Sequence, residues 1–150
     1  MSAETDLVKL YSDRILALAT DIPHLVRLDT PDATVKRRAP LCGSTVTVDI
    51  ALRDGKVSQF GQDVKACALG QAAASIVGRA VIGTTREQIV AGRDGLKAML
   101  KEDGPTPPAP FDGLEVLRPA KDYKNRHASI LLTLDALSEA MDQVSQSDCG

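Results

Sequence analysis

Apolar and polar residues alternate strictly over one stretch in the first third of the chain. Every second position between residues 45 and 52 is apolar, which is the period of a half-buried β-strand. Asp54-Gly55 follows, a pair that two-residue hairpin turns favour because both central residues need positive φ. Residues 57–66 then read as the returning strand. The pattern therefore predicts an antiparallel hairpin that turns at Asp54-Gly55.

The register of this hairpin brings two cysteines toward the same end of the sheet. With Arg53 opposite Lys56, the same register places Cys42 opposite Cys67 at the hairpin mouth. Directly opposed side chains have Cβ atoms about 4.5–5.5 Å apart. The apolar positions of the second strand change parity once, so a bulge or a longer turn, for example near Gly61, would slip the pairing by one residue. Either register predicts two neighbouring thiols.

Helical periodicity dominates the rest of the chain. Apolar residues recur at steps of three and four in four segments, residues 5–19, 67–80, 94–100 and 127–144. Thr84-x-x-Glu87 matches a capping box and predicts the start of another short helix. The segment 104–110 contains four prolines and is expected to be a surface loop.

One more strand completes the expected sheet. Residues 34–38 are predicted to form a short, basic edge strand beside the hairpin, ended by Pro40. About three strands followed by a run of helices indicate an α+β fold, a small antiparallel sheet with helices packed on one face. The length suits a single domain over residues 1–150, and polar residues 1–4 and 145–150 are expected to be disordered tails.

Composition excludes several classes of function. The net charge is −2 and aromatic residues make up 3%, so we expect no nucleic-acid binding. No apolar run reaches the length of a membrane span and the N-terminus is polar, which predicts a cytoplasmic protein without membrane contact. Three cysteines are an odd number and do not suggest a disulfide framework, so a reduced thiol or metal role is favoured.

Three residues carry the candidate chemistry. Cys67 lies where strand changes to helix, so free backbone N–H groups, the helix dipole and nearby Lys65 favour its thiolate form. His127 opens the last helix on its apolar stripe and points inward. The alternative interpretation is a purely structural core or capping residue whose hydrogen bonds are made within the protein. Together with Cys42 they offer three of the four ligands of a tetrahedral zinc or cluster site. Cys149 and His24 are expected to be inert.

Several short motifs, taken in order, are similar to one known family. Tyr11-Ser12-Asp13-Arg14, Leu41-Cys42-Gly43, the strand-ending Cys67 and Arg126-His127-Ala128 resemble the NifU/IscU family of iron–sulfur cluster assembly scaffolds. The separation of Cys67 from His127 resembles the SufU-like branch, with an insertion over about residues 92–114. The resemblance implies a SufE/NifU-like fold and assigns Cys42 and Cys67 to the first two cysteine ligands.

The chain departs from the family pattern at three places. Ala128 stands where the family has its third cysteine, and Ser44 replaces the aspartate of Cys-Gly-Asp. The segment 122–126, Asp-Tyr-Lys-Asn-Arg, stands where the IscU branch carries its chaperone-docking motif. The ligand set implied by the resemblance is thus reduced to Cys42, Cys67 and His127.

Three functions follow as alternatives. The first is a non-enzymatic scaffold that binds iron, zinc or a labile iron–sulfur cluster through Cys42, Cys67 and His127. The second is a sulfurtransferase-type partner of a cysteine desulfurase that accepts persulfide sulfur on Cys67. The third is a degenerate member that acts only by protein interaction. The resemblance implies cysteine desulfurase and cluster-acceptor proteins as partners, and a homodimer sharing one cluster is a further option.

Overall fold

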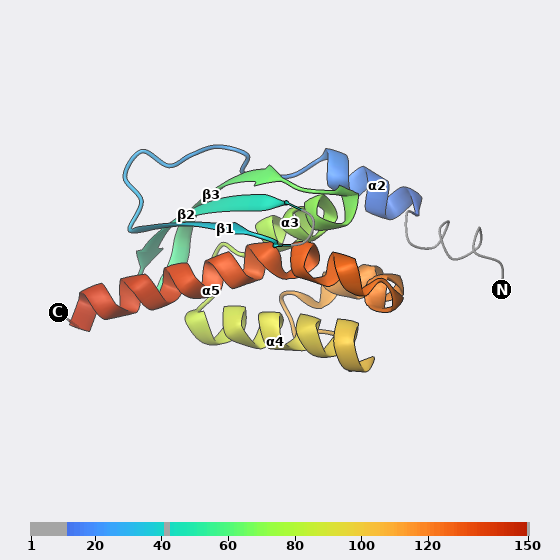
Figure 1. The fold of residues 1–150 in the computed structure, drawn as a ribbon. Coiled ribbons are helices and arrows are strands. Elements are labelled where there is room, and N and C mark those ends of the chain that lie inside the picture. Colours follow the sequence, from blue (N-terminus) through green and yellow to red (C-terminus); the bar gives the residue numbers. More distant parts are fainter. Residues whose placement is uncertain (1–11, 41–42, 150) are drawn as a thin grey trace.

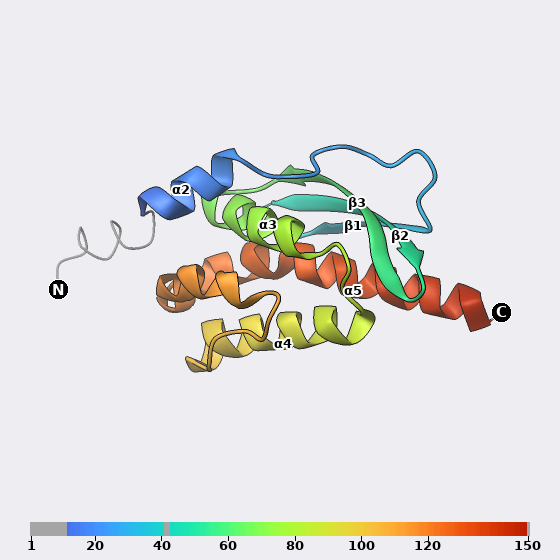
Figure 2. The same ribbon diagram turned by 180° about the vertical axis from the view of Figure 1, so that it is seen from behind.

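The structure is a computed structural model that describes residues 12–40 and 43–149. Three antiparallel strands form one sheet in the order β1-β2-β3, and helices lie against one of its faces (Figures 1 and 2). The elements in chain order are α2 (Asp13–Thr20), β1 (Ala33–Arg38), β2 (Thr45–Arg53), β3 (Lys56–Lys65), α3 (Ala68–Ala80), α4 (Arg86–Glu102), the 3₁₀ helices η1 (Asp112–Asp122) and η2 (Lys124–Arg126), and α5 (His127–Cys149). The predicted α+β class is confirmed.

The predicted hairpin is present, with its turn at Asp54-Gly55. Both residues have positive φ, 56° and 77°, as a type I′ turn requires. The register changes once between Ala51 and Leu52, and Ser58 is the extra residue. The bulge therefore lies next to the turn and not near Gly61. It allows Val57 and Phe60, which differ in parity, both to be buried.

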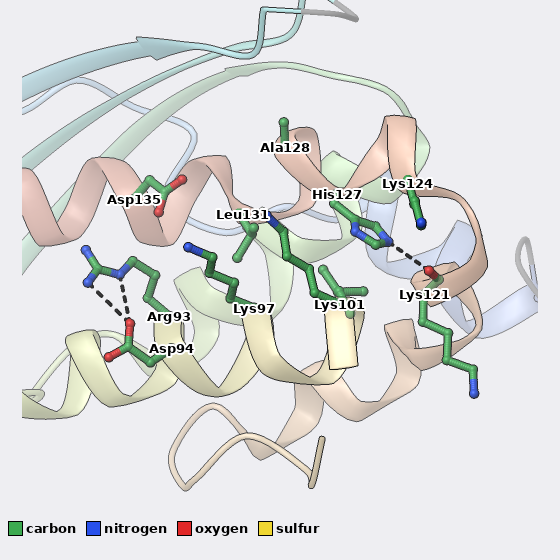
Figure 3. Close-up of a pocket in the computed structure, with 11 residues that line it drawn as sticks. Arg93, Asp94, Lys97, Lys101, Lys121, Lys124, His127, Ala128, Leu131 and Asp135 are labelled. Atoms are coloured by element: carbon green, nitrogen blue, oxygen red, sulfur yellow. Dashed lines mark hydrogen bonds and ion pairs between the residues drawn. The ribbon is translucent and has the colours of Figure 1, made fainter. Parts of the chain in front are cut away.

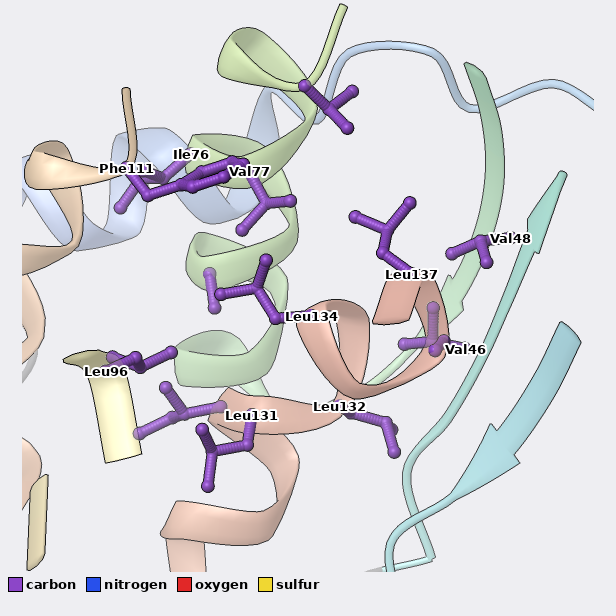
Figure 4. Close-up of a cluster of buried hydrophobic side chains, with 14 of the residues drawn as sticks. Val46, Val48, Ile76, Val77, Leu96, Phe111, Leu131, Leu132, Leu134 and Leu137 are labelled. Atoms are coloured by element: carbon purple, nitrogen blue, oxygen red, sulfur yellow. The ribbon is translucent and has the colours of Figure 1, made fainter. Parts of the chain in front are cut away.

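Helices α3 and α5 cover the apolar face of the sheet, and α4 packs on the outer side of α5 (Figure 2). The predicted stripe of α5 is buried throughout, from His127 at 5% exposure to Val144 at 7%. Leu134 and Leu137 of this helix face Val77 of α3 and Val48 of β2 in the core (Figure 4). Burial of such aliphatic side chains, worth about 1.5–3 kcal/mol each, holds the helices on the sheet.

Two helix predictions are wrong in detail. The capping box belongs to Thr85 and Gln88, because the hydroxyl of buried Thr84 donates to the Val81 carbonyl instead. Helix α4 is also one continuous helix where the periodicity suggested a short helix and a later turn. Gly92 lies inside this helix, and the absence of a side chain there makes room for the buried ring of Phe111.

Part of the opposite face of the sheet, around Asp49, is covered by the connection between α2 and β1 (Figure 1). The Asp49 carboxylate on this face is fully excluded from solvent and accepts hydrogen bonds from Arg27, from the Leu28 backbone N–H and from the Thr34 hydroxyl. Burial raises the pKa of this carboxyl, but the Arg27, Thr34 and Leu28 hydrogen bonds outweigh burial and lower its pKa below the ordinary value. Asp49 thus fastens the connection to the sheet.

The ends of the chain bear on two further predictions. The backbone of α5 continues through Cys149, where polar residues suggested a tail, because neither Gly nor Pro interrupts residues 144–149. The predicted helix over residues 5–19 is described only from Asp13, which Ser12 precedes as N-cap. Within the described residues, no helix is long and apolar enough to cross a membrane. The limits of the single domain stay a prediction.

Candidate functional site

Cys67 occupies the N-cap position of α3, at the predicted change from strand to helix. Its side chain makes no capping hydrogen bond to the helix and is partly exposed to solvent. The Sγ atom lies 3.5 Å from the hydroxyl oxygen of Ser129, in the first turn of α5. The thiol is therefore open to a ligand on one side and contacts a hydroxyl on the other. This position matches the predicted environment of a helix N-terminus.

A short chain of hydroxyl groups leads from this thiol into the protein. The Ser129 hydroxyl donates to the Ser44 hydroxyl over 3.1 Å, and both serines are almost completely buried. Since Ser129 has a single hydroxyl proton, the neutral Cys67 thiol donates to Ser129 in this arrangement. A Cys67 thiolate would instead accept, which requires the Ser129 hydroxyl to turn toward sulfur. Ser129 is thus placed to respond to the ionisation of Cys67.

Gly70 explains how α5 comes so close to the start of α3. A Cβ atom on Gly70 would collide with the Ser129 hydroxyl and lie 2.9 Å from the Ala66 Cβ. Only a residue without a side chain allows this approach of two helices. The only sequence signal for Ser129 is that it is a polar residue within the apolar start of the last helix, two positions after His127.

The first candidate cysteine lies outside the described residues. Cys42 falls in the connection between β1 and β2, of which Ala39, Pro40, Gly43 and Ser44 are described. The Ala39 N–H donates to the Ser44 carbonyl and the Gly43 N–H donates to the Ala39 carbonyl, which closes a tight turn. Ser44, two residues after Cys42, is the residue that contacts Ser129.

His127 is the first residue of α5 and is buried, as its place on the apolar stripe predicted. Its Nε2 atom lies 3.1 Å from the Lys121 carbonyl oxygen (Figure 3) and 3.0 Å from that of Ala120. Because carbonyl oxygens only accept, Nε2 carries the proton and a neutral ring would offer Nδ1 as its ligating atom. These bonds also serve the structural role of tying η1 to α5.

The remaining candidates do not gather at this site. His24 is exposed, and its ring meets the edge of Phe60 at 5.9 Å between centroids. The side chain of Cys149 is not described. In the described part of the chain, no three His, Cys, Asp or Glu side chains are grouped closely enough to hold one metal ion. The set of Cys42, Cys67 and His127 therefore stays a prediction.

Comparison with known proteins finds relatives that share this architecture. No family model matches the sequence. The crystal structure of the N-terminal part of a NifU-like protein from Brucella abortus is 44% identical, with a TM-score of 0.92 over 94% of this chain and 98% of that one. FiSufU from Fervidobacterium islandicum AW-1 shares the fold, with a TM-score of 0.78 and 18% identity over 89% of this chain and 98% of that one.

A curated relative agrees with these structures. The iron–sulfur cluster assembly scaffold protein IscU of Thermotoga maritima is 23% identical over 142 residues, which cover 91% of this chain and 96% of that protein. The 44% identity to the Brucella structure extends over nearly the whole of both chains. The chain therefore belongs to the NifU/IscU family of iron–sulfur cluster assembly scaffolds.

Proposed function

We propose that this chain carries iron, zinc or a labile iron–sulfur cluster as cargo, held by Cys42, Cys67 and His127. The observation that supports this most is the setting of Cys67, a partly exposed thiol at an uncapped helix N-terminus. Ser129 connects it to Ser44, which follows Cys42 in the connection between β1 and β2. The chain itself needs no catalytic turnover for this role.

The chemistry of the donor set suits such cargo. Thiolates and a neutral imidazole are the ligands that zinc and iron–sulfur clusters take from proteins. The Ser129 hydroxyl lies 3.5 Å from the Cys67 sulfur and is placed to donate to it once the sulfur is bound to cargo. His127 would ligate through Nδ1, since Nε2 is bound to the Ala120 and Lys121 carbonyls. This hydrogen bond would orient the ring.

The fourth ligand has to come from outside the three residues. Ala128 has no ligating atom, and the Ser44 hydroxyl accepts a hydrogen bond from Ser129. A solvent molecule, an outside thiol or the cysteines of a second copy would complete the shell. The cargo is therefore expected to be labile and easily passed on, as a cluster-acceptor partner requires.

Metal retention tests this proposal. Protein loaded anaerobically with zinc or with iron and sulfide is challenged with a chelator, and metal per chain is followed by elemental analysis. Loss of Cys42, Cys67 or His127 by substitution with serine or alanine should abolish retention. Ala128→Cys should slow metal loss by about tenfold or more, because it adds a fourth thiolate at the start of α5.

Ala128→Ser is the matched control, since it adds a side chain of similar size without a strong ligand. It should leave metal loss at the wild-type rate. Equal retention by wild type, Cys42→Ser and Ala128→Cys would show that the three residues do not form a metal site.

A second candidate, persulfide transfer, is supported by the partial exposure of the Cys67 thiol. In this reaction the Cys67 thiolate attacks the outer sulfur of the persulfide on a cysteine desulfurase. The donor S–S bond breaks, the outer sulfur with its proton moves to Cys67, and the desulfurase cysteine leaves as a thiolate. Mass spectrometry would detect the gain of one sulfur atom by metal-free protein, lost in Cys67→Ser. A chain that takes up neither metal nor sulfur would act by protein interaction alone.

A further inference from the structure

A groove of ≈ 730 Å³ runs between α4 and α5 (Figure 3). This volume is within the range of about 300–1,000 Å³ found for ligand clefts. Leu100 and Leu131, both nearly buried, belong to its lining, and His127 and Ala128 lie at one end. We call it the α4–α5 groove; its other lining residues are Arg93, Asp94, Lys97, Lys101, Lys121, Lys124 and Asp135.

The groove is strongly positive although the whole chain has a net charge of −2. Five of its lining side chains are cationic and two are anionic. Asp94 pairs with Arg93 at 3.3 Å, and Lys121 pairs with Asp103 at 3.3 Å. In the described part of the chain, Lys97, Lys101 and Lys124 have no ion-pair partner within 4.0 Å, so their charge is available to a ligand.

The cations on α4 are evenly spaced. Arg93, Lys97 and Lys101 are four residues apart, so they lie on one face of the helix with about 6 Å between successive positions. In an extended peptide, alternate residues are about 6.6 Å apart and point to the same side. Carboxylates at alternate positions of an extended segment would therefore meet these cations in register. A small compact anion could span only part of the row.

We propose that the α4–α5 groove binds an extended acidic segment of a partner protein, with Asp or Glu at alternate positions. The carboxylates pair in register with Lys97 and Lys101 of α4, Lys124 adds positive charge beside His127, and the peptide backbone runs over Leu100 and Leu131. Arg93 and Asp135 mark the far end, where the carboxylates of Asp94 and Asp135 already offset positive charge. The segment therefore binds most strongly at the end beside His127.

This position connects the groove to the candidate site. His127 and Ala128 line the groove, and the next residue, Ser129, contacts Cys67. A partner held by an acidic segment would thus be kept beside the proposed cargo site. Binding of the acidic segment does not depend on metal. A failure of the peptide to bind and a failure of the chain to retain metal are therefore separate results.

Fluorescence anisotropy of a labelled hexapeptide with alternating Glu and Ser tests the proposal on the metal-free full chain at low ionic strength. We expect saturable binding that weakens as salt is added. The double variant Lys97→Glu, Lys101→Glu should weaken binding by about tenfold or more, because it replaces attraction with repulsion. Both positions are exposed on α4 and Glu is a good helix former, so unfolding curves should confirm that the variant folds.

Three comparisons decide the outcome. Lys36→Glu, at an exposed position on β1 outside the groove, should change the affinity by less than about twofold. The same hexapeptide with Gln in place of Glu should not bind. Equal weakening by Lys36→Glu would reveal non-specific attraction and overturn the proposal. It would also be overturned if citrate bound as tightly as the acidic peptide, since the groove would then be a site for a small anion.

Discussion

Asp49→Asn should destabilise the fold by loosening the connection that covers the outer face of the sheet. The carboxylate is fully buried and accepts four hydrogen bonds, two from Arg27, one from Leu28 and one from Thr34. An asparagine of the same shape keeps only one carbonyl oxygen, and its NH₂ group faces donors. The Thr34 hydroxyl can rotate to accept from it, but the Arg27 guanidinium cannot accept.

The expected loss of stability follows from the hydrogen-bond groups that lose their partner. Arg27 and Thr34 are exposed and regain water, whereas the amide that replaces the fully buried carboxylate at position 49 does not. Leaving a buried hydrogen-bond group without a full partner costs about 1–3 kcal/mol in the free energy of unfolding. For a chain of this length, that corresponds to a fall in Tm of about 2–12 °C. Urea unfolding followed by circular dichroism measures the difference.

The pH dependence of this difference has a definite sign. The folded pKa of Asp49 is lowered, so its contribution is present above the unfolded pKa of about 3.9 and is lost as pH falls through the folded pKa. Wild type and Asp49→Asn should therefore differ most at neutral pH and converge below about pH 4. Asp29→Asn, an exposed aspartate in the same connection, serves as the control and should unfold like wild type at every pH. Equal stability of Asp49→Asn and wild type at neutral pH would refute the role assigned to Asp49.

Three further substitutions test the contacts of Cys67 and the packing of α5. Ser129→Ala should change the rate at which iodoacetamide alkylates Cys67 without unfolding the protein, because it removes the hydroxyl that contacts the thiol; an unchanged rate would contradict this contact. Gly70→Ala should lower the Tm through its collision with Ser129, as overpacking costs about 1–3 kcal/mol, and Ser129→Gly should restore part of the loss. Ser138→Ala should leave stability unchanged or raise it by up to about 1 kcal/mol in thermal melts, since the buried Ser138 hydroxyl has no partner among the described residues.

Local signals in the sequence determined the main elements of this fold. The alternation over residues 45–52 and the Asp54-Gly55 pair predicted the hairpin because the side-chain period and the turn conformation are properties of a few neighbouring residues. The change of period at Cys67 and the long stripe from His127 likewise placed α3 and α5 correctly. These elements could be found from the sequence alone because their conformation does not depend on residues far away in the chain.

Where two local patterns competed, tertiary contacts decided between them. Both Thr84 and Thr85 are followed three residues later by Glu or Gln, so either could begin α4. Thr84 is excluded because it is buried in the turn after α3, where its carbonyl accepts from the Val57 N–H at the start of β3. Glycine suits position 92 within α4 because the ring of Phe111, nineteen residues later, fills the space that a side chain would need.

The candidate site shows the same division. The resemblance in motifs offers Cys42, Cys67 and His127 as candidates, since those residues stand next to recognisable starts of strands and helices. Ser129 could not be found in this way, because its role comes from the close approach of α3 and α5 at Gly70. Nor could the α4–α5 groove, whose cations come from helices separated by a loop of prolines. The amino-acid types along the chain set which side chains are chemically able to act. The packing of distant segments decides which of these side chains come into contact.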